Sequence, residues 1–203
     1  MEGPGFVIRT ERDRVLAAAV RVIAHRGYAA ATLEEIAAET FLPVSEVLAL
    51  VGDKEECFLA AFTASTQRAY LNALERYEGD DPWPVRLRDA LAAFLETLAA
   101  EPDFVRACTL EVPIVGERAY ARLSAAMEAF TAFLEPGCDA RADADGGALG
   151  AEIVAGGVFH VLLRYAREDR VEDVQEALPE LTRVVLAPFC EPAEIEAVVS
   201  FGG

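Results

Sequence analysis

Apolar residues recur at every third or fourth position along almost the whole chain, and no segment alternates for long between apolar and polar residues. A period near 3.6 residues indicates helices that bury one face, whereas alternation predicts strands. Glycine and proline interrupt the pattern at intervals, and we expect helices to begin or end there. The pattern therefore predicts an all-α fold of about nine helices. Their expected bounds are residues 9–26, 33–40, 44–51, 54–78, 83–100, 103–111, 116–135, 148–168 and 172–189, with an acidic loop at 138–147 and a possible last turn at 193–199.

The N-terminal segment has the clearest boundary signals. Thr32 is followed three residues later by Glu35, the spacing of a capping box, so the second helix is expected to begin there. Gly27 and Gly52 follow the first and third apolar stretches, and glycine commonly ends helices. Pro43 stands at the start of the third helix, where its fixed φ is tolerated. Three compact helices with a tight turn before the third predict a helix-turn-helix, whose third helix enters the DNA major groove.

Two stretches of this segment resemble the N-terminal domain of the TetR family of ligand-responsive transcriptional regulators. They are A-H-R-G-Y-x(3)-T-L-E-E-I-A-A-E at residues 24–39 and G-D-K-E-E-x-F at residues 52–58. The similarity continues more weakly through D-P-W-P-V-R-L-R-D-A-L at 81–91 and L-T-R-V-V-L-A-P-F at 181–189. It covers nearly the whole chain, with specific motifs only in the first third.

The resemblance implies two domains and a regulatory function. Residues 1–54 would form a helix-turn-helix DNA-binding domain, and residues 55–203 a helical ligand-binding and dimerisation domain. The chain would then be a transcriptional regulator, a repressor that binds palindromic operator DNA as a homodimer and is released by a small apolar effector. The helices expected at 148–168 and 172–189 are too apolar for the edge of a small monomer, so we expect them to form the dimer interface.

The third helix carries little that reads DNA bases. The family usually has a glycine in the preceding turn, a serine cap and a phosphate-binding tyrosine, where this chain has Phe41, Pro43 and Leu48. Among the expected base-reading positions, only Ser45 and Glu46 can hydrogen-bond a base edge, and the apolar ones can touch thymine methyl groups. The residues expected at the DNA are Arg9, Thr32, Val44, Ser45, Glu46, Ala49 and Lys54, with Arg9, Thr32 and Lys54 on phosphates.

The acidic composition argues against strong DNA binding. The net charge is −17, and residues 1–62 hold six Lys and Arg against ten Asp and Glu, a net of −4. Non-specific DNA affinity comes almost entirely from cations that neutralise phosphates. A second interpretation therefore stays open, in which a TetR-like protein with a degenerate recognition helix binds a ligand or a partner without binding DNA.

Aromatic residues of the middle helices are spaced to face inward, which fits either a plain core or an effector pocket. Residues 63–203 hold twelve Lys and Arg against twenty-five Asp and Glu, so their net charge of −13 favours a cationic or neutral effector. The residues expected at the ligand are Phe62, Tyr70, Phe94, Phe104, Cys108, Glu111, Tyr120, Met127, Phe130, Phe159 and His160, with Arg106 as a further polar candidate.

Little in the sequence points to other chemistry. The four cysteines are far apart with no CxxC pair, which argues against a zinc site and a disulfide framework and fits reduced thiols in the cytoplasm. No Ser–His–Asp arrangement, glycine-rich phosphate loop or metal-ligand cluster is visible, so neither an enzyme nor a cofactor is predicted. No secretory signal precedes the first helix, and no apolar run reaches the roughly 20 residues that span a bilayer.

Overall fold

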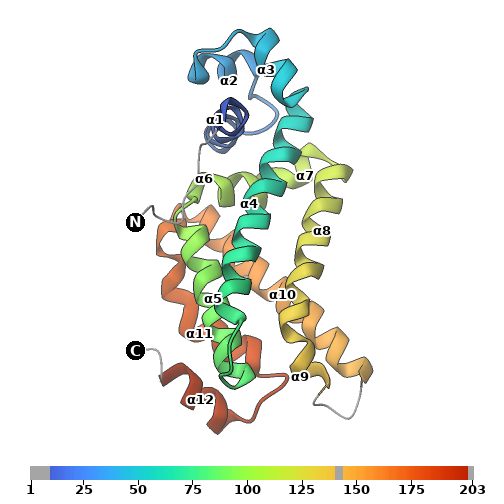
Figure 1. Cartoon of the computed structure of the whole chain (residues 1–203), viewed down its shortest axis with the longest axis vertical. Coiled ribbons are helices and arrows are strands. Elements are labelled where there is room, and N and C mark those ends of the chain that lie inside the picture. Colours follow the sequence, from blue (N-terminus) through green and yellow to red (C-terminus); the bar gives the residue numbers. More distant parts are fainter. Residues whose placement is uncertain (1–9, 140–143, 201–203) are drawn as a thin grey trace.

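The computed structural model describes residues 10–139 and 144–200. Every regular element in those two ranges is a helix, so the all-α fold that the periodicity predicts is confirmed. Figure 1 shows the three N-terminal helices at one end of an elongated molecule and a helical bundle below them. This arrangement matches the expected helix-turn-helix followed by a helical domain.

The three N-terminal helices begin and end within two residues of the expected positions. They are α1 (Glu11–Arg26), α2 (Leu33–Thr40) and α3 (Val44–Val51). The predicted capping box opens α2, because the Thr32 hydroxyl accepts from the Glu35 N–H at 3.2 Å and the Glu35 carboxylate accepts from the Thr32 N–H at 3.1 Å. The largest fully buried side chains among these helices are Val15, Leu16, Ile23, Ile36 and Val47.

Helix α4 (Lys54–Tyr77) connects the helix-turn-helix to the bundle. Its N-terminus is capped by Asp53, whose carboxylate accepts a hydrogen bond from the Glu56 N–H at 2.9 Å. Below the helix-turn-helix, α4 packs along the antiparallel helix α5 (Trp83–Ala99). Both helices lie where the sequence places them.

The helix expected at 103–111 changes geometry half-way. It begins as α6 (Pro102–Arg106) and continues as a π-helical turn, η1 (Ala107–Glu111). A short helix, α7 (Val112–Val115), follows directly and ends at Gly116. A π-helical turn inserts an extra residue into the hydrogen-bonded ladder and occurs frequently at functional sites. The apolar pattern does not reveal it, because the insertion changes only the register of the backbone bonds.

The next expected helix is interrupted near its end. Helix α8 (Glu117–Thr131) gives way to a single 3-10 turn, η2 (Ala132–Leu134), and then to α9 (Glu135–Asp139). We expected Pro136 to end a helix, and this expectation is wrong. The proline lies in the first turn of α9, where the missing N–H has no intrahelical partner to lose.

The C-terminal part contains α10 (Ala144–Arg167), the 3-10 turn η3 (Val171–Ala177), α11 (Leu178–Leu186) and α12 (Pro192–Ser200). The single helix expected at 172–189 is therefore divided in two. The expected last turn is a full helix, α12. The expected acidic loop is shorter than predicted, because α9 and α10 occupy both of its ends; residues 140–143 lie outside the described residues.

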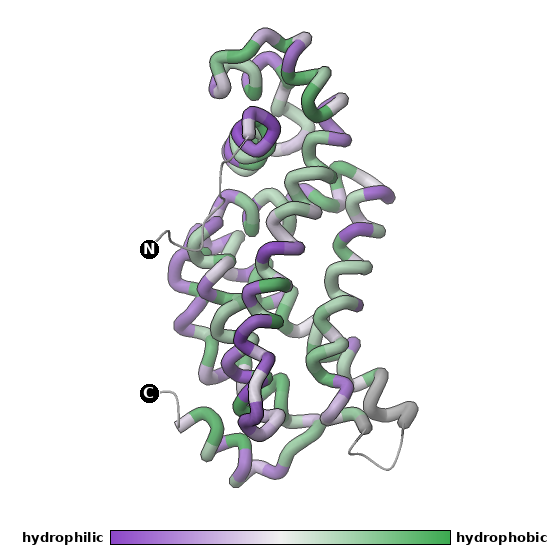
Figure 2. Tube along the Cα trace, in the orientation of Figure 1, coloured by the Kyte–Doolittle hydropathy of each residue, from purple (hydrophilic) through white to green (hydrophobic). Residues whose placement is uncertain are grey.

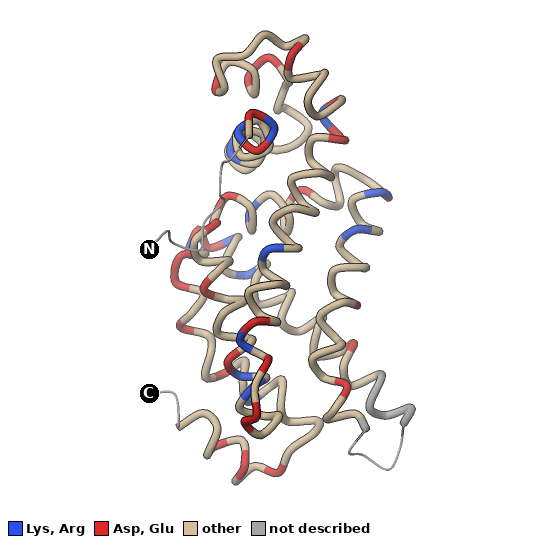
Figure 3. Tube along the Cα trace, viewed as in Figure 1, with Lys and Arg blue, Asp and Glu red and all other residues tan. Residues whose placement is uncertain are grey.

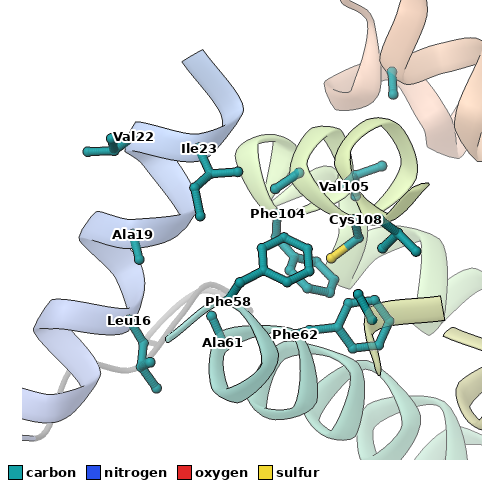
Figure 4. Packing of buried hydrophobic residues seen from close by; sticks show 14 of the residues in the cluster. Leu16, Ala19, Val22, Ile23, Phe58, Ala61, Phe62, Phe104, Val105 and Cys108 are labelled. Atoms are coloured by element: carbon teal, nitrogen blue, oxygen red, sulfur yellow. The ribbon is translucent and has the colours of Figure 1, made fainter. Parts of the chain in front are cut away.

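The helix-turn-helix and the bundle share one hydrophobic core. Figure 4 shows Ile23 of α1 near Phe58 of α4 and Phe104 of α6, and the same buried cluster contains Phe62 of α4. The ring centroids of Phe58 and Phe62 are 6.4 Å apart, and those of Phe62 and Phe104 are 6.2 Å apart. The two expected domains are thus joined by packed side chains as well as by α4.

Candidate ligand cavity and nucleic-acid surface

A cavity of about 160 Å³, partly open to the surface, lies between α4, α5, α6, α8 and α10. Its wall is formed almost entirely by aliphatic and aromatic side chains. Concave, mostly apolar cavities of this kind are the usual sites for small ligands. Seven of the residues expected at the ligand contribute to the wall: Phe62, Phe94, Phe104, Cys108, Met127, Phe130 and Phe159.

Phe130 stands at the centre of an aromatic cluster beside the cavity. Its ring centroid lies 4.6 Å from that of Phe94, 5.6 Å from that of Tyr70 and 5.9 Å from that of Phe133. The Tyr70–Phe130 pair is T-shaped, and such pairs are worth about 0.5–1.5 kcal/mol beyond the area they bury. The cluster fixes the lower part of α8 against α4 and α5.

The few polar groups of the cavity wall are already satisfied or neutral. The Thr109 hydroxyl donates to the carbonyl oxygen of Val105 at 2.7 Å. Burial raises the pKa of the Cys108 thiol well above its ordinary value, so the sulfur is uncharged. No charged side chain lines the cavity within the described ranges. The cavity itself therefore suits an apolar group.

A shallower groove lies between α4 and α8 and continues the cavity outward. Phe62, Thr66, Ala126 and Phe130 line both the cavity and the groove. Tyr70, which we expected at the ligand, lines the groove only. The four shared side chains thus lie where the cavity and the groove meet.

Three residues expected at the ligand lie elsewhere. Tyr120 is 62% exposed on α8, and His160 is exposed on α10. Glu111 faces the helix-turn-helix. Adjacent residues of a helix point about 100° apart, so His160 is directed outward because its neighbour Phe159 faces the cavity. Arg106 is paired with acidic residues, 3.2 Å from Asp103 and 2.5 Å from Asp169.

The sequence interpretation missed the contribution of α5. Leu87, Leu91 and Leu98 line the cavity together with Phe94. The four residues are spaced i, i+4, i+7 and i+11 and share one face of the helix. The helical spacing of these leucines is visible in the sequence, but the candidate ligand residues were chosen mainly among aromatic side chains.

Lys54 is bound within the protein. Its Nζ donates to the carbonyl oxygens of Tyr28 and Ala31 at 2.7 and 2.9 Å. The same nitrogen lies 4.4 Å from the centre of the Tyr28 ring, a cation–π contact. Two of its three N–H donors are therefore used to hold the connection between α1 and α2.

The arginines near the helix-turn-helix are also largely neutralised. Arg21 pairs with Glu39 at 3.0 Å, and Arg26 pairs with Glu35 at 3.2 Å. Arg14 lies 3.5 Å from Glu11. Arg9 lies outside the described residues. These pairs reduce the positive potential that would attract phosphates.

The outer face of α3 is mostly apolar. Ser45, Glu46 and Ala49 are exposed, Val44 is half-buried, and Leu48 is 44% exposed. Figure 2 shows hydrophobic positions over most of α3, and Figure 3 shows no basic residue on it. All the predicted base-reading residues are thus on or near the surface. The only charge among them is the negative charge of Glu46, which does not attract DNA phosphates.

Phe41 adds to this apolar surface. It is 94% exposed and has φ 58°, the left-handed conformation that glycine adopts most readily. It follows α2 at the position where the family usually has glycine. The backbone geometry of the turn is therefore kept although the residue has changed.

Besides the shared hydrophobic core, a hydrogen bond joins the π-helical turn of the cavity wall to the helix-turn-helix. Oε2 of Glu111, the last residue of η1, accepts a hydrogen bond from the Tyr28 N–H at 2.7 Å. The Tyr28 ring packs edge-on against Phe58 with centroids 5.9 Å apart. Cys108, also in η1, lines the cavity. A change in the shape of η1 would therefore be felt directly at the end of α1.

No protein-family model matches the sequence, and no curated protein matches it. Solved structures do share its fold. The fatty acid degradation regulator FadR of Bacillus halodurans has a TM-score of 0.77 and 17% identity, over 87% of this chain and 94% of that one. FadR of Bacillus subtilis, solved in complex with stearoyl-CoA, has a TM-score of 0.74 and 14% identity, over 87% and 98%. PfmR of Thermus thermophilus, a TetR-family transcriptional regulator, has a TM-score of 0.64 and 20% identity, over 88% and 97%.

The chain has the TetR-family fold. The three solved proteins named above, which share this fold, are transcriptional regulators. At the present level of identity the likeness establishes the fold alone. Within the described ranges, no three His, Cys, Asp or Glu side chains gather in a way that suits a metal ion.

Helix α10 of this TetR fold carries an apolar stripe on its outer face. Leu149 is 58% exposed and Ile153 is 66% exposed, one turn apart, and the exposed His160 lies two turns further along. Val184 of the neighbouring helix α11 is 53% exposed. Leu149–Arg167 is also long and apolar enough to cross a membrane, a test that core helices of soluble proteins pass as well.

Proposed function

We propose that this chain is a ligand-responsive transcriptional regulator whose DNA affinity changes when an effector fills the cavity. One observation carries the proposal: η1 lines the cavity with Cys108 and holds the helix-turn-helix through Glu111. The structural neighbours, which are transcriptional regulators, support it. The function needs no cofactor and places the protein in the cytoplasm.

The active form is proposed to be a homodimer built on α10 and α11. The exposed side chains of Leu149, Ile153 and Val184 lie on two helices that pack against each other. Covering exposed apolar surface is the main driving force for stable association. A two-fold dimer would bring the same patch of each protomer together. It would place two α3 helices about one DNA turn apart, the spacing of palindromic half-sites.

The proposed effector has an apolar part that fills the cavity. This follows from the wall, whose described residues include no charged side chain. The Bacillus subtilis neighbour was solved with stearoyl-CoA, which contains a long acyl chain. We propose that effector binding distorts η1, weakens the Glu111–Tyr28 contact and releases the operator, which makes the protein a repressor.

At the DNA, the proposed contacts are the α3 residues Ser45, Glu46 and Ala49, with Val44 against a thymine methyl group. Thr32 at the N-terminus of α2 is proposed to hold a phosphate, because helix N-termini bind anions. Lys54 has one N–H left for a second phosphate. Few cations take part, so the affinity is expected to depend only weakly on salt, with each neutralised phosphate contributing about −0.9 to the slope.

A second function is favoured by the exposed apolar surface formed by Phe41 and Leu48. In this alternative the helix-turn-helix binds a protein partner, and the DNA contact has been lost. Aromatic residues are common at the energetic centres of protein interfaces. The same surface carries no cation that could pair with phosphate, which argues against DNA binding.

The deciding experiment is a mobility-shift assay with the DNA that flanks the chain's own gene. Lys54→Ala is a poor test there, because it removes two hydrogen bonds that hold the α1–α2 connection. Ala49→Glu is sharper, since Ala49 is exposed on α3 and the new charge would face the DNA phosphates. Ala197→Glu on α12 adds the same charge to an exposed position at the other end of the molecule.

DNA binding predicts a specific complex that Ala49→Glu weakens at least tenfold and that Ala197→Glu leaves unchanged. A folded dimer that forms no specific complex even at low salt would instead select the partner-binding alternative. A complex that both variants weaken equally would show non-specific attraction only.

A further inference from the structure

We infer that the effector is an amphiphile whose apolar tail occupies the cavity and whose anionic head is held by Arg122 in the groove between α4 and α8. The inference rests on the cavity proposed above as the effector site. It adds the chemistry of the second half of the ligand, which the apolar cavity does not specify.

The groove is placed to receive a head group. It shares Phe62, Thr66, Ala126 and Phe130 with the cavity, so a tail that passes these side chains enters the cavity. On the surface side the groove has a polar edge that includes Thr63, Gln67 and Arg122. One end of the site is thus apolar, and the other is more open to solvent and has a polar edge.

Arg122 is the one charged side chain of the groove within the described ranges. Its Nη1 donates to the Thr63 hydroxyl oxygen at 2.6 Å, and the Thr63 hydroxyl donates onward to the carbonyl oxygen of Leu59 at 2.8 Å. This pair of bonds holds the guanidinium against α4 at the edge of the groove. A guanidinium has five N–H donors, so most of them remain available to a carboxylate or phosphate.

The contrast with Arg118 shows what is unusual about Arg122. Arg118 lies one turn earlier on α8 and is paired with Glu55 at 3.0 Å and Glu56 at 2.7 Å. Figure 3 shows basic positions near the start of α8. Elsewhere in the bundle, Arg68 of α4 is likewise bound to a carboxylate, that of Glu101. No carboxylate lines the groove beside Arg122 in the part of the chain that the structure describes.

The acidic character of the domain does not oppose this assignment. Exposed charges separated by more than about 8–10 Å are largely screened at physiological ionic strength. A head group in the groove therefore interacts mainly with the nearest charge, which is Arg122. A cationic head would meet this arginine with no described carboxylate in the groove lining to balance it. Local geometry thus reverses the preference that the net charge of −13 for residues 63–203 suggested.

The test compares four probes with the same twelve-carbon tail: dodecanoate, dodecyl phosphate, dodecanol and dodecyltrimethylammonium. Each is titrated below its micelle concentration into the full chain, and the dissociation constant is measured by calorimetry. Arg122→Gln removes the charge and keeps a polar side chain, and Arg118→Gln is the matched control one turn away. Dodecanol reports whether the cavity of each variant is intact.

We expect at least one anionic probe to bind more tightly than dodecanol. Arg122→Gln should weaken the binding of that probe by about fivefold to tenfold, a loss between that of an exposed ion pair and that of a charge-assisted hydrogen bond. The dissociation constant of dodecanol should change less than twofold. Which anion gains more distinguishes a carboxylate from a phosphate head. The inference is overturned if dodecanol or the cation binds as tightly as both anions, if no probe binds, or if Arg122→Gln leaves the anions unaffected.

The measurement contains no DNA, so its result is independent of the mobility-shift assay. Anion binding through Arg122 together with no DNA complex would keep the ligand and reject the regulator. A DNA complex together with anion binding that Arg122→Gln leaves unaffected would keep the regulator and reject the anionic head group.

Discussion

Single residues show how far this chain has departed from a basic DNA reader. Lys54 has the position of a phosphate-binding lysine, but its ammonium group is held by two backbone carbonyls and the Tyr28 ring. Phe41 has the backbone conformation of a glycine and a side chain that is almost fully exposed. Both residues keep the helix-turn-helix in shape, and neither adds positive charge to its surface.

Phe41→Gly is expected to stabilise the protein. A non-glycine residue at φ 58° is strained, and the exposed ring has little packing to lose. We expect a gain of about 0.5–1 kcal/mol and a rise in Tm of about 1–3 °C, measured by thermal unfolding. Ala38→Gly, at an exposed helical position of α2, should have the opposite sign at about 1 kcal/mol. If the partner-binding alternative holds, Phe41→Gly also lowers the affinity for the partner while it stabilises the fold.

Cys57 predicts a loss of stability at alkaline pH. Burial raises the pKa of its thiol from 9.0 to about 12, with a small opposing effect of Arg12. The folded pKa is the higher one, so the stabilising contribution is complete below about pH 9 and is lost as the pH rises towards 12. Urea unfolding at pH 8 and 10.5 should show a fall that is smaller in Cys57→Ala by on the order of 1–2 kcal/mol. An equal fall in both proteins would show that Cys57 ionises freely in the folded state.

Among the elements, η1 provides the most direct link between the cavity and the helix-turn-helix. Its π-helical geometry directs Cys108 to the cavity and Glu111 to the Tyr28 N–H. Helix α3 is the opposite case, because its exposed face is ready for a contact but offers few polar groups. The cavity and the η1 contacts that connect it to the helix-turn-helix are therefore formed by specific side chains, whereas the α3 surface that they would control offers few groups for binding.

Glu111→Ala is expected to uncouple the two sites. It leaves the half-buried Tyr28 N–H without an acceptor, which costs about 1–3 kcal/mol of stability. Glu111 does not line the cavity, so ligand affinity measured by calorimetry should change less than twofold. The effect of the ligand on DNA or partner affinity should fall severalfold. Glu128→Ala, at an exposed position of α8, is the control, and a loss of coupling in that variant too would remove the special role of Glu111.

At the scale of the whole molecule, charge and apolar surface are arranged separately. The basic side chains are mostly neutralised by nearby acids, and Figure 3 shows acidic residues spread over the length of the molecule. The largest exposed aliphatic side chains include Leu149 and Ile153 on one face of α10. A second copy of the chain would cover that face without bringing clustered charges together.

Ile153→Glu is expected to break the proposed dimer. Light scattering at micromolar concentration should give twice 21.9 kDa for the unaltered chain and 21.9 kDa for the variant. A buried, unpaired carboxylate on each protomer would cost several kcal/mol at the interface. Ala197→Glu on α12 should remain dimeric. A monomeric unaltered chain, or a dimeric Ile153→Glu variant, would place the interface elsewhere or remove it.

The sequence by itself determined the helices and most of their ends. Capping by Thr32 and Glu35, the apolar period and the glycines after α1 and α3 act between residues a few positions apart, so they are readable in order along the chain. The same local signals gave seven residues of the cavity wall, because inward-facing positions repeat with the helical period. They did not reveal the π-helical turn, whose bonds depend on what packs around it.

Only the tertiary structure decided which polar groups meet. Tyr28 and Glu111 are 83 residues apart in sequence, Lys54 and Tyr28 are 26 apart, and Arg122 and Thr63 are 59 apart. No local pattern encodes such pairs, because each depends on how α4, η1 and α8 pack around the shared core. For that reason the sequence placed Glu111 at the ligand, gave no sign that Lys54 binds the α1–α2 connection, and did not single out Arg122. The fold brought Glu111 and Lys54 to Tyr28 and placed Arg122 at the groove.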